Sequence, residues 1–194
     1  MAKFGIDIDE VLRSLLPGMV EIYNNRFHDS LTVDDIKEFD VDISFPKVKQ
    51  ATGESASKWF FQQYDSTLFR ESPVIEGAVN AIKRLREADH QVYLVSYQKS
   101  ISNKINTLEW LSENGFEYDG ICFIKDKTIV HLDYFIDDND WNFIRCNCTH
   151  GVLINAPYNK NINLELIHKV SNCETMERFD SLSDFVDKFL DLPF

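Results

Sequence analysis

Acidic side chains lie at the ends of two short apolar runs of the sequence. Asp7 and Asp9 lie at the end of the run KFGIDI, and the adjacent acids Asp137 and Asp138 follow the run DYFI. Adjacent like charges after an apolar strand are costly unless a cation lies beside them, and carboxylate oxygens are ligands that Mg²⁺ prefers. As isolated residues these acids would cap main-chain amides, but together they predict metal binding and catalysis.

Two further polar residues follow apolar runs in the same way. Ser96 ends the run YLVS, and Lys127 comes shortly after the run ICFI. In open α/β sheets, ligands bind at the carboxyl ends of the strands. Alone, Lys127 would be interpreted as a solvated surface residue. Together with the four acids, the two residues predict a single site at one edge of a sheet.

The elements that must position these residues alternate between strands and helices. Helical spacing of apolar residues follows Pro73, Ser96 and Ser181, and the last of these helices begins with a capping-box pattern. We expect strands at 3–8, 91–96, 121–124, 133–136 and 151–155. This alternation predicts an α/β fold with a doubly wound, mostly parallel sheet.

Residues 14–72 interrupt this alternation. The segment has helical patches and an aromatic cluster at Trp59, Phe60 and Phe61, but no strong strand pattern. We expect it to form a small inserted helical cap that packs on a core made of residues 1–13 and 73–194.

The composition limits the classes of partner. The chain has 194 residues, and 32 acidic against 20 basic side chains give it a net charge of −12. This charge opposes a nucleic-acid backbone and argues against binding of long DNA or RNA, whereas a small anionic substrate can still enter a locally basic pocket. No apolar run approaches the roughly 20 residues that span a bilayer, and no secretory signal is recognisable, so we expect a cytoplasmic protein. The oligomeric state stays open, with a homodimer among the alternatives.

Four cysteines, Cys122, Cys146, Cys148 and Cys173, are too few for a disulfide scaffold and are typical of a reducing compartment. Cys146, Cys148 and His150 offer metal-ligating atoms. Ligands this close splay apart along a strand, however, and a fourth partner is not evident. We therefore interpret these cysteines as packing thiols.

The order of the motifs resembles that of the haloacid dehalogenase-like (HAD) phosphohydrolases. Their first motif is a strand followed by Asp-x-Asp, here Asp7-Ile8-Asp9, and it is followed by a strand ending in Ser or Thr, a Lys, and a strand ending in paired acids. Within this superfamily, the stretches DKTIV at 126–130, DYFIDD at 133–138 and NAPYN at 155–159 are similar to the 5′(3′)-deoxyribonucleotidase branch. The resemblance spans most of the chain.

This resemblance implies an Mg²⁺-dependent phosphomonoesterase that acts on nucleoside monophosphates. Asp7 would attack phosphorus to give an aspartyl-phosphate, while Asp9 would protonate the leaving oxygen and then take a proton from the hydrolytic water. Mg²⁺ would bind to Asp7, to the Asp9 carbonyl and to the acidic pair, chiefly Asp138 but also Asp137.

The resemblance also implies roles for residues near the phosphate. Ser96 would hydrogen-bond a phosphoryl oxygen, and Lys127 would neutralise its charge. Lys125 falls where the deoxyribonucleotidases tend to have a second basic residue. Glu10 departs from the glycine that often follows the second Asp in this superfamily, and we interpret it as a structural residue.

Substrate choice would come from the cap, since the phosphate site cannot distinguish one monoester from another. Trp59, Phe60, Phe61 and Phe69 are candidates for stacking a nucleobase, although aromatic residues at helical spacing also fill a cap's own core. Two alternatives stay open: a phosphatase for another small ester such as a sugar phosphate, and a non-catalytic binding domain. The intact set of acids and Lys127 argues against the second.

Overall fold

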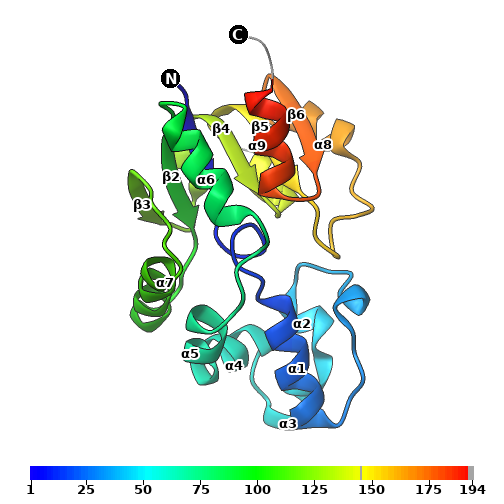
Figure 1. Ribbon diagram of the computed structural model, residues 1–194. Helices are drawn as coiled ribbons and strands as arrows, with labels where there is room; N and C mark the ends of the chain where they lie inside the picture. Colours follow the sequence, from blue (N-terminus) through cyan, green and yellow to red (C-terminus); the bar gives the residue numbers. More distant parts are fainter. Residues whose placement is uncertain (145, 192–194) are drawn as a thin grey trace.

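The computed structural model describes residues 1–144 and 146–191. Its centre is a sheet of six parallel strands in the order β3-β2-β1-β4-β5-β6 (Figure 1). The strands are β1 Lys3–Ile6, β2 Gln91–Ser96, β3 Gly120–Phe123, β4 Leu132–Asp137, β5 Cys148–Ile154 and β6 Thr175–Phe179. The predicted doubly wound α/β fold is confirmed, with β6 added to the five expected strands.

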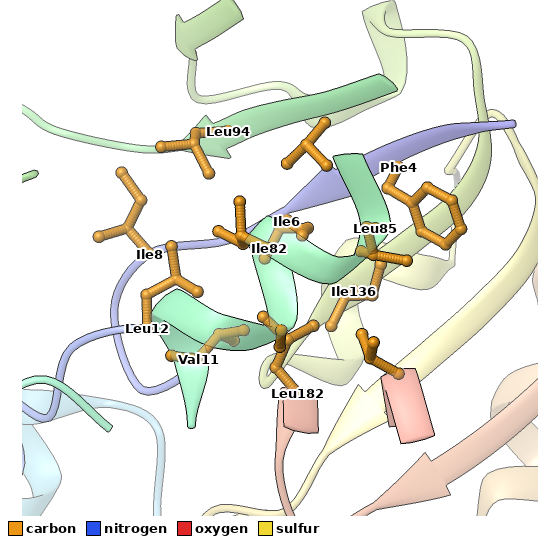
Figure 2. Close-up of a cluster of buried hydrophobic side chains, with 14 of the residues drawn as sticks. Phe4, Ile6, Ile8, Val11, Leu12, Ile82, Leu85, Leu94, Ile136 and Leu182 are labelled. Atoms are coloured by element: carbon orange, nitrogen blue, oxygen red, sulfur yellow. The ribbon is translucent and has the colours of Figure 1, made fainter. Parts of the chain in front are cut away.

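Helices cover both faces of this sheet. The elements are α6 Ala78–Glu87, α7 Ile101–Glu113, α8 Leu164–Val170 and α9 Leu182–Leu190, with short 3₁₀ helices η2 Lys127–Ile129 and η3 Asp140–Phe143. Apolar residues of α6 and α9 pack against β1, and Figure 2 shows Ile82, Leu85 and Leu182 gathered around Phe4 and Ile6. A second buried cluster lies beside α8 and η3 and is described below with its cysteines.

The sequence of α9 shows why such a helix forms where it does. The Ser181 hydroxyl accepts a hydrogen bond from the main-chain N–H of Asp184 at 3.1 Å, as the capping pattern predicts. Its apolar residues Leu182, Phe185 and Phe189 are buried against the sheet. The polar face stays in solvent, so the helix is fixed to the core by one side.

Residues of the expected cap form a separate group of helices, drawn at the lower end of Figure 1. They are α1 Leu16–Phe27, η1 Val33–Asp35, α2 Val41–Ser44, α3 Pro46–Thr52, α4 Ala56–Gln63 and α5 Asp65–Arg70. This helical segment has its own hydrophobic cluster, built around Tyr23, Phe45 and Phe60. On one side it meets the core where α5 packs against α7, and Arg70 lies 2.6 Å from both Glu109 and Glu113 there. No described helix is long and apolar enough to cross a membrane.

Candidate active site

Three neighbouring strands bring the acidic residues together. The order β2-β1-β4 and the parallel pairing align Ile6 of β1 with Leu94 of β2 and with Ile136 of β4. The residues that follow these positions therefore meet at one edge of the sheet. The main-chain N–H of Asp7 donates to the Ile136 carbonyl at 2.9 Å, which fixes Asp7 beside the acidic pair.

Lys127 links two of these acids. It lies on η2, its side chain is 5% exposed, and its Nζ is 2.9 Å from Asp7 Oδ2 and 2.6 Å from Asp137 Oδ2. Burial lowers the pKa of Lys127, but the charges of Asp137 and Asp7 outweigh burial, so its pKa lies above the ordinary value. Lys127 is therefore a fixed cation inside the site.

Asp7, Asp137 and Asp138 form a buried group of carboxylates. One oxygen from each lies within 4.8 Å of the others. Among the residues that the structure describes, Asp7 Oδ1 is a buried oxygen without a hydrogen-bond partner. Burial raises the pKa of Asp7 to about 7, with Lys127 opposing the shift and Asp137 and Asp9 adding to it. Burial and the charges of Asp137 and Asp7 also raise the pKa of Asp138.

The charge and burial of these carboxylates suit a divalent cation. Three buried carboxylates repel one another, and a single lysine cannot neutralise them all. An unpartnered carboxylate oxygen facing this group is the type of atom that a hard cation binds. The donor set fits Mg²⁺.

Asp137 differs from its neighbour in its partners. Its Oδ1 accepts from the main-chain N–H of Asn139 at 2.9 Å and from Asn142 Nδ2 at 3.0 Å, and its Oδ2 binds Lys127. Asn142 lies on η3, immediately after the acidic pair. Sequence reasoning missed it, although an amide close behind paired acids is a recognisable signal. Asp137 therefore holds Lys127 in position.

Asp9 lies beside this group and is held by different residues. Its Oδ2 accepts from Gln98 Nε2 at 2.8 Å, and the same amide lies 3.3 Å from Ser96 Oγ. Its Oδ1 accepts from Arg13 Nε at 3.1 Å and also from Arg13 Nη2. The Asp9 carboxylate is therefore oriented by Arg13 and Gln98 and is not one of the three clustered carboxylates. Neither of these two partners was singled out by sequence reasoning.

Glu10 has a structural role, as expected from the sequence. Its φ of 56° lies in the left-handed region that favours glycine. Its Oε1 accepts hydrogen bonds from the main-chain N–H groups of Leu15 and Leu16, at 2.6 and 2.9 Å, where α1 begins. Burial raises the pKa of Glu10 to about 7. The side chain thus satisfies helix donors that would otherwise be unpaired.

The stretch NAPYN at 155–159 holds Asp138 through two of its side chains. The Tyr158 hydroxyl donates to the Asp138 carboxylate, and Asn159 Nδ2 donates to the main-chain carbonyls of Asp138 and Ile154, each at 2.7 Å. Asn159 is almost completely buried. Both residues therefore contact the second residue of the acidic pair, although neither was assigned a role from the sequence.

The structure does not bring two of the predicted cap residues to this edge. Trp59 and Phe60 are 3% and 0% exposed, and their rings pack inside the cluster of the helical segment, where they contact Phe27, Tyr64 and Phe45. Such rings have no free face for a nucleobase. The alternative interpretation, that these rings fill the cap's own core, is therefore the correct one.

The other residues predicted for the site lie in different surroundings. Ser96 is buried at the carboxyl end of β2, next to the amide that binds Asp9, whereas Lys125 is exposed in the loop after β3. Phe69 lies under the guanidinium of Arg13, and the Phe61 ring packs against Phe69.

An aromatic residue that sequence reasoning missed lies closer to the acids. Phe39, in the loop between η1 and α2, is 53% exposed, and its ring centroid is 5.4 Å from that of Tyr158 in an edge-on contact. Because Tyr158 binds Asp138, Phe39 brings an exposed ring of the helical segment beside the acidic site.

Comparisons with known proteins identify the family of the chain. The family model described as 5′ nucleotidase, deoxy (pyrimidine), cytosolic type C protein (NT5C) matches residues 2–179. A 5′(3′)-deoxyribonucleotidase of Clostridium acetobutylicum is 29% identical over 186 residues, which cover 94% of this chain and 97% of that protein. A protein of the same name from Bacillus subtilis is 30% identical over 176 residues, covering 89% and 95%.

Solved structures share the fold. The crystal structure of a predicted phosphatase from Clostridium acetobutylicum superposes with a TM-score of 0.66 at 14% identity, and the alignment covers 98% of this chain and 99% of that one. The resemblance inferred from the motifs is confirmed. The chain belongs to the NT5C family of 5′ nucleotidases, phosphoric monoester hydrolases of the HAD-like superfamily.

Proposed function

We propose that the protein hydrolyses nucleoside monophosphates, preferentially deoxyribonucleotides, in an Mg²⁺-dependent reaction that passes through a phosphorylated Asp7. The observation that carries this proposal is the Asp7 carboxylate itself. It is buried, one of its oxygens has no hydrogen-bond partner, and it lies beside Lys127 and two further carboxylates. The names of the similar proteins support the choice of nucleotides as substrates.

Asp7, Asp138 and Asp137 would hold Mg²⁺, with the Asp9 carbonyl as a further ligand by family resemblance. When bound, the cation reduces the repulsion between a phosphate dianion and the carboxylate that attacks it. Lys127 contributes a second positive charge beside Asp7. Asp137 and Asn142 keep that charge in position through their hydrogen bonds.

In the first step, an Asp7 oxygen forms a bond to phosphorus while the bond to the ester oxygen breaks. Asp9 gives a proton to that leaving oxygen, and in the second step it takes one from the water that hydrolyses the aspartyl-phosphate. Arg13 and Gln98 fix the direction of the Asp9 carboxylate for both transfers. Ser96 and Lys127 bind phosphoryl oxygens, with Lys125 as a second basic residue at the loop.

Segment 14–72 is proposed to act as the cap. Contacts with the loop after β5 support this role: Phe39 meets Tyr158, and Lys160 Nζ lies 3.2 Å from Asp34 Oδ1. An exposed ring beside a phosphate site is suited to stack a base, and such stacking stabilises binding by about 1–3 kcal/mol. The cytoplasmic location and the homodimer stay predictions.

A phosphate-release screen tests the proposal. Purified protein with Mg²⁺ is given deoxyribonucleotides, ribonucleotides, sugar phosphates and phosphoamino acids, with chelator-treated protein and Asp7→Asn as controls. We expect the fastest release from deoxyribonucleotides, lost on chelation. Fastest release from sugar phosphates would establish the alternative substrate class, and release from none of these compounds would establish a binding domain.

A further inference from the structure

Three of the four cysteines meet in one buried cluster, which the nucleotidase reaction does not use. Cys146 follows η3, Cys148 begins β5, and Cys173 lies in the turn between α8 and β6. They are 2%, 7% and 7% exposed and belong to the same hydrophobic cluster as Phe135 and Leu153. We call Cys146, Cys148 and Cys173 the thiol cluster.

The sulfur atoms of the thiol cluster are close to one another. The distances between Sγ atoms are 2.9 Å for Cys146 and Cys148, 3.1 Å for Cys146 and Cys173, and 3.3 Å for Cys148 and Cys173. Non-bonded carbon atoms pack best at about 3.5–4.0 Å, and sulfur is larger than carbon. The three sulfur atoms are therefore closer than ordinary packing brings thiols, and they form a group of soft donor atoms that one cation could bind together.

The sequence suggested His150 as a third ligand, but in the structure the His150 ring has other partners. The His150 ring stacks on Tyr134 with centroids 4.5 Å apart, and its Nδ1 is 2.8 Å from Thr175 Oγ1. Cys173, which is distant in the sequence, supplies the third ligand atom beside Cys146 and Cys148. The interpretation of Cys146 and Cys148 as packing thiols rested on the lack of such a partner.

A neighbouring glycine leaves room for the side chains around the thiol cluster. A methyl group on Gly151 would lie 3.1 Å from Cys173 Sγ and 3.2 Å from Met176 Cγ. The Met176 side chain packs against the same hydrophobic cluster as the three cysteines. Sulfur donors select soft cations such as Cu⁺ and Zn²⁺ over Mg²⁺.

We propose that Cys146, Cys148 and Cys173 form a three-thiolate site for one thiophilic cation, Zn²⁺ or Cu⁺, separate from the acidic site. Each thiol loses its proton when the cation binds. A zinc–sulfur bond of about 2.3 Å places tetrahedral sulfur ligands roughly 3.8 Å apart, so the triangle needs to open by less than about 1 Å.

The position of the thiol cluster gives the cation a structural role. Cys148 lies at the amino end of β5, whereas Asp137 pairs with Leu153 near the other end of that strand. A bound cation would join the connection after η3 to the turn before β6. Because η3 carries Asn142, which binds Asp137, the cation would also stabilise the position of Asn142 beside Asp137.

Metal titration of the full chain tests this proposal. Reduced, metal-free protein is titrated with Zn²⁺ and, anaerobically, with Cu⁺, each in competition with a chromophoric chelator, and Mg²⁺ serves as the hard-ion comparison. We expect one equivalent of Zn²⁺ or Cu⁺ to bind to the wild-type chain and to Cys122→Ser, a matched variant outside the thiol cluster. Binding to Cys146→Ser and Cys173→Ser should be weaker by at least about tenfold.

A measurement on the wild-type chain keeps the test independent of how the variants fold. Cd²⁺ bound to thiolates absorbs in the ultraviolet in proportion to the number of thiolates, and we expect three per cation. Failure of both Zn²⁺ and Cu⁺ to bind, equal binding by Cys173→Ser, or a disulfide within the thiol cluster in the freshly isolated protein would overturn the site.

Discussion

Arg13 and Asp9 form an ion pair that extends from the protein interior to the active site. Arg13 is completely buried, whereas the Asp9 side chain is 25% exposed. The guanidinium lies between the rings of Phe69 and Trp110, with its carbon 5.0 and 5.1 Å from their centroids, and it also donates to the Phe69 carbonyl. The residue proposed to transfer protons is therefore held by a side chain that also binds the helical segment.

The first prediction concerns this ion pair. Arg13→Lys keeps the charge but loses the planar fork that holds Asp9, so we expect kcat to fall at least about tenfold. The loss should be larger for esters with poor leaving groups, because these need the proton from Asp9. Steady-state rates on two esters that differ in leaving group check this. Arg70→Lys, at the exposed pair with Glu109, is the matched control, and equal effects of the two variants would contradict the role of Arg13.

The second prediction concerns the nucleophile. Asp7→Asn should lower kcat by at least about a thousandfold, because an amide is a poor nucleophile and a weaker metal ligand. The fold should persist, since the substitution relieves repulsion among buried carboxylates. Phosphate release and thermal unfolding measure both effects. Asp191→Asn, at an exposed position, should leave both unchanged. Turnover by purified Asp7→Asn close to that of the wild-type protein would refute the aspartyl-phosphate route.

Asp138 gives a prediction about metal dependence. Asp138→Asn should raise the Mg²⁺ concentration needed for half-maximal activity at least about tenfold, because one charged ligand is lost. High Mg²⁺ should restore part of the rate, whereas it should not rescue Asp7→Asn. Activity measured across a series of Mg²⁺ concentrations decides the point, and an unchanged metal requirement would remove Asp138 from the ligand set.

The sequence predicted the acidic site because its residues obey a simple rule of parallel sheets. Ser96 and Asp137 are the last residues of β2 and β4, and Asp7 directly follows β1. Adjacent parallel strands bring their carboxyl ends together. Arg13 escaped this reasoning because its partners Phe69 and Trp110 come from distant parts of the chain.

Burial and exposure within the helical segment were harder to predict. Trp59 and Phe60 have helical spacing, which indicates an apolar face but not what that face meets. Phe39 lies in a loop without periodicity, so no pattern marks it. The strand β6 reads TMERF, whose charged residues at an edge of the sheet hide its strand character. Cys173, the third residue of the thiol cluster, lies in the turn that precedes this same strand. Its position beside Cys146 and Cys148 could therefore not be predicted without β6.

Glu10 leads to a prediction about pH and stability. Its pKa rises from an ordinary value of 4.5 to about 7 on folding, so the folded state retains a proton that the unfolded chain loses between these values. The free energy of unfolding should therefore fall as pH rises from about 4.5 to about 7, and then level off. Asp7 and Asp138 act in the same direction.

The substitution Glu10→Gln measures how much Glu10 contributes to the pH dependence of the free energy of unfolding. The glutamine carbonyl can still accept from Leu15 and Leu16, so the turn should persist. Urea unfolding of both proteins at a series of pH values, with chelator present, should show a shallower fall for the variant. Identical slopes would mean that Glu10 does not retain its proton in the folded state.

The last prediction concerns the base. If the exposed Phe39 ring stacks a nucleobase, Phe39→Ala should lower kcat/KM for nucleotides by about tenfold or more, chiefly through KM, because stacking is worth roughly 1–3 kcal/mol. A base-free phosphate ester should be hydrolysed at an unchanged rate, since it has no base for Phe39 to stack on. Trp59→Ala provides the contrast: it removes a ring from the core of the helical segment, so it should lower thermal stability and impair both substrates together. Equal losses on both substrates for Phe39→Ala would show that Phe39 supports the segment's structure and does not contact the base.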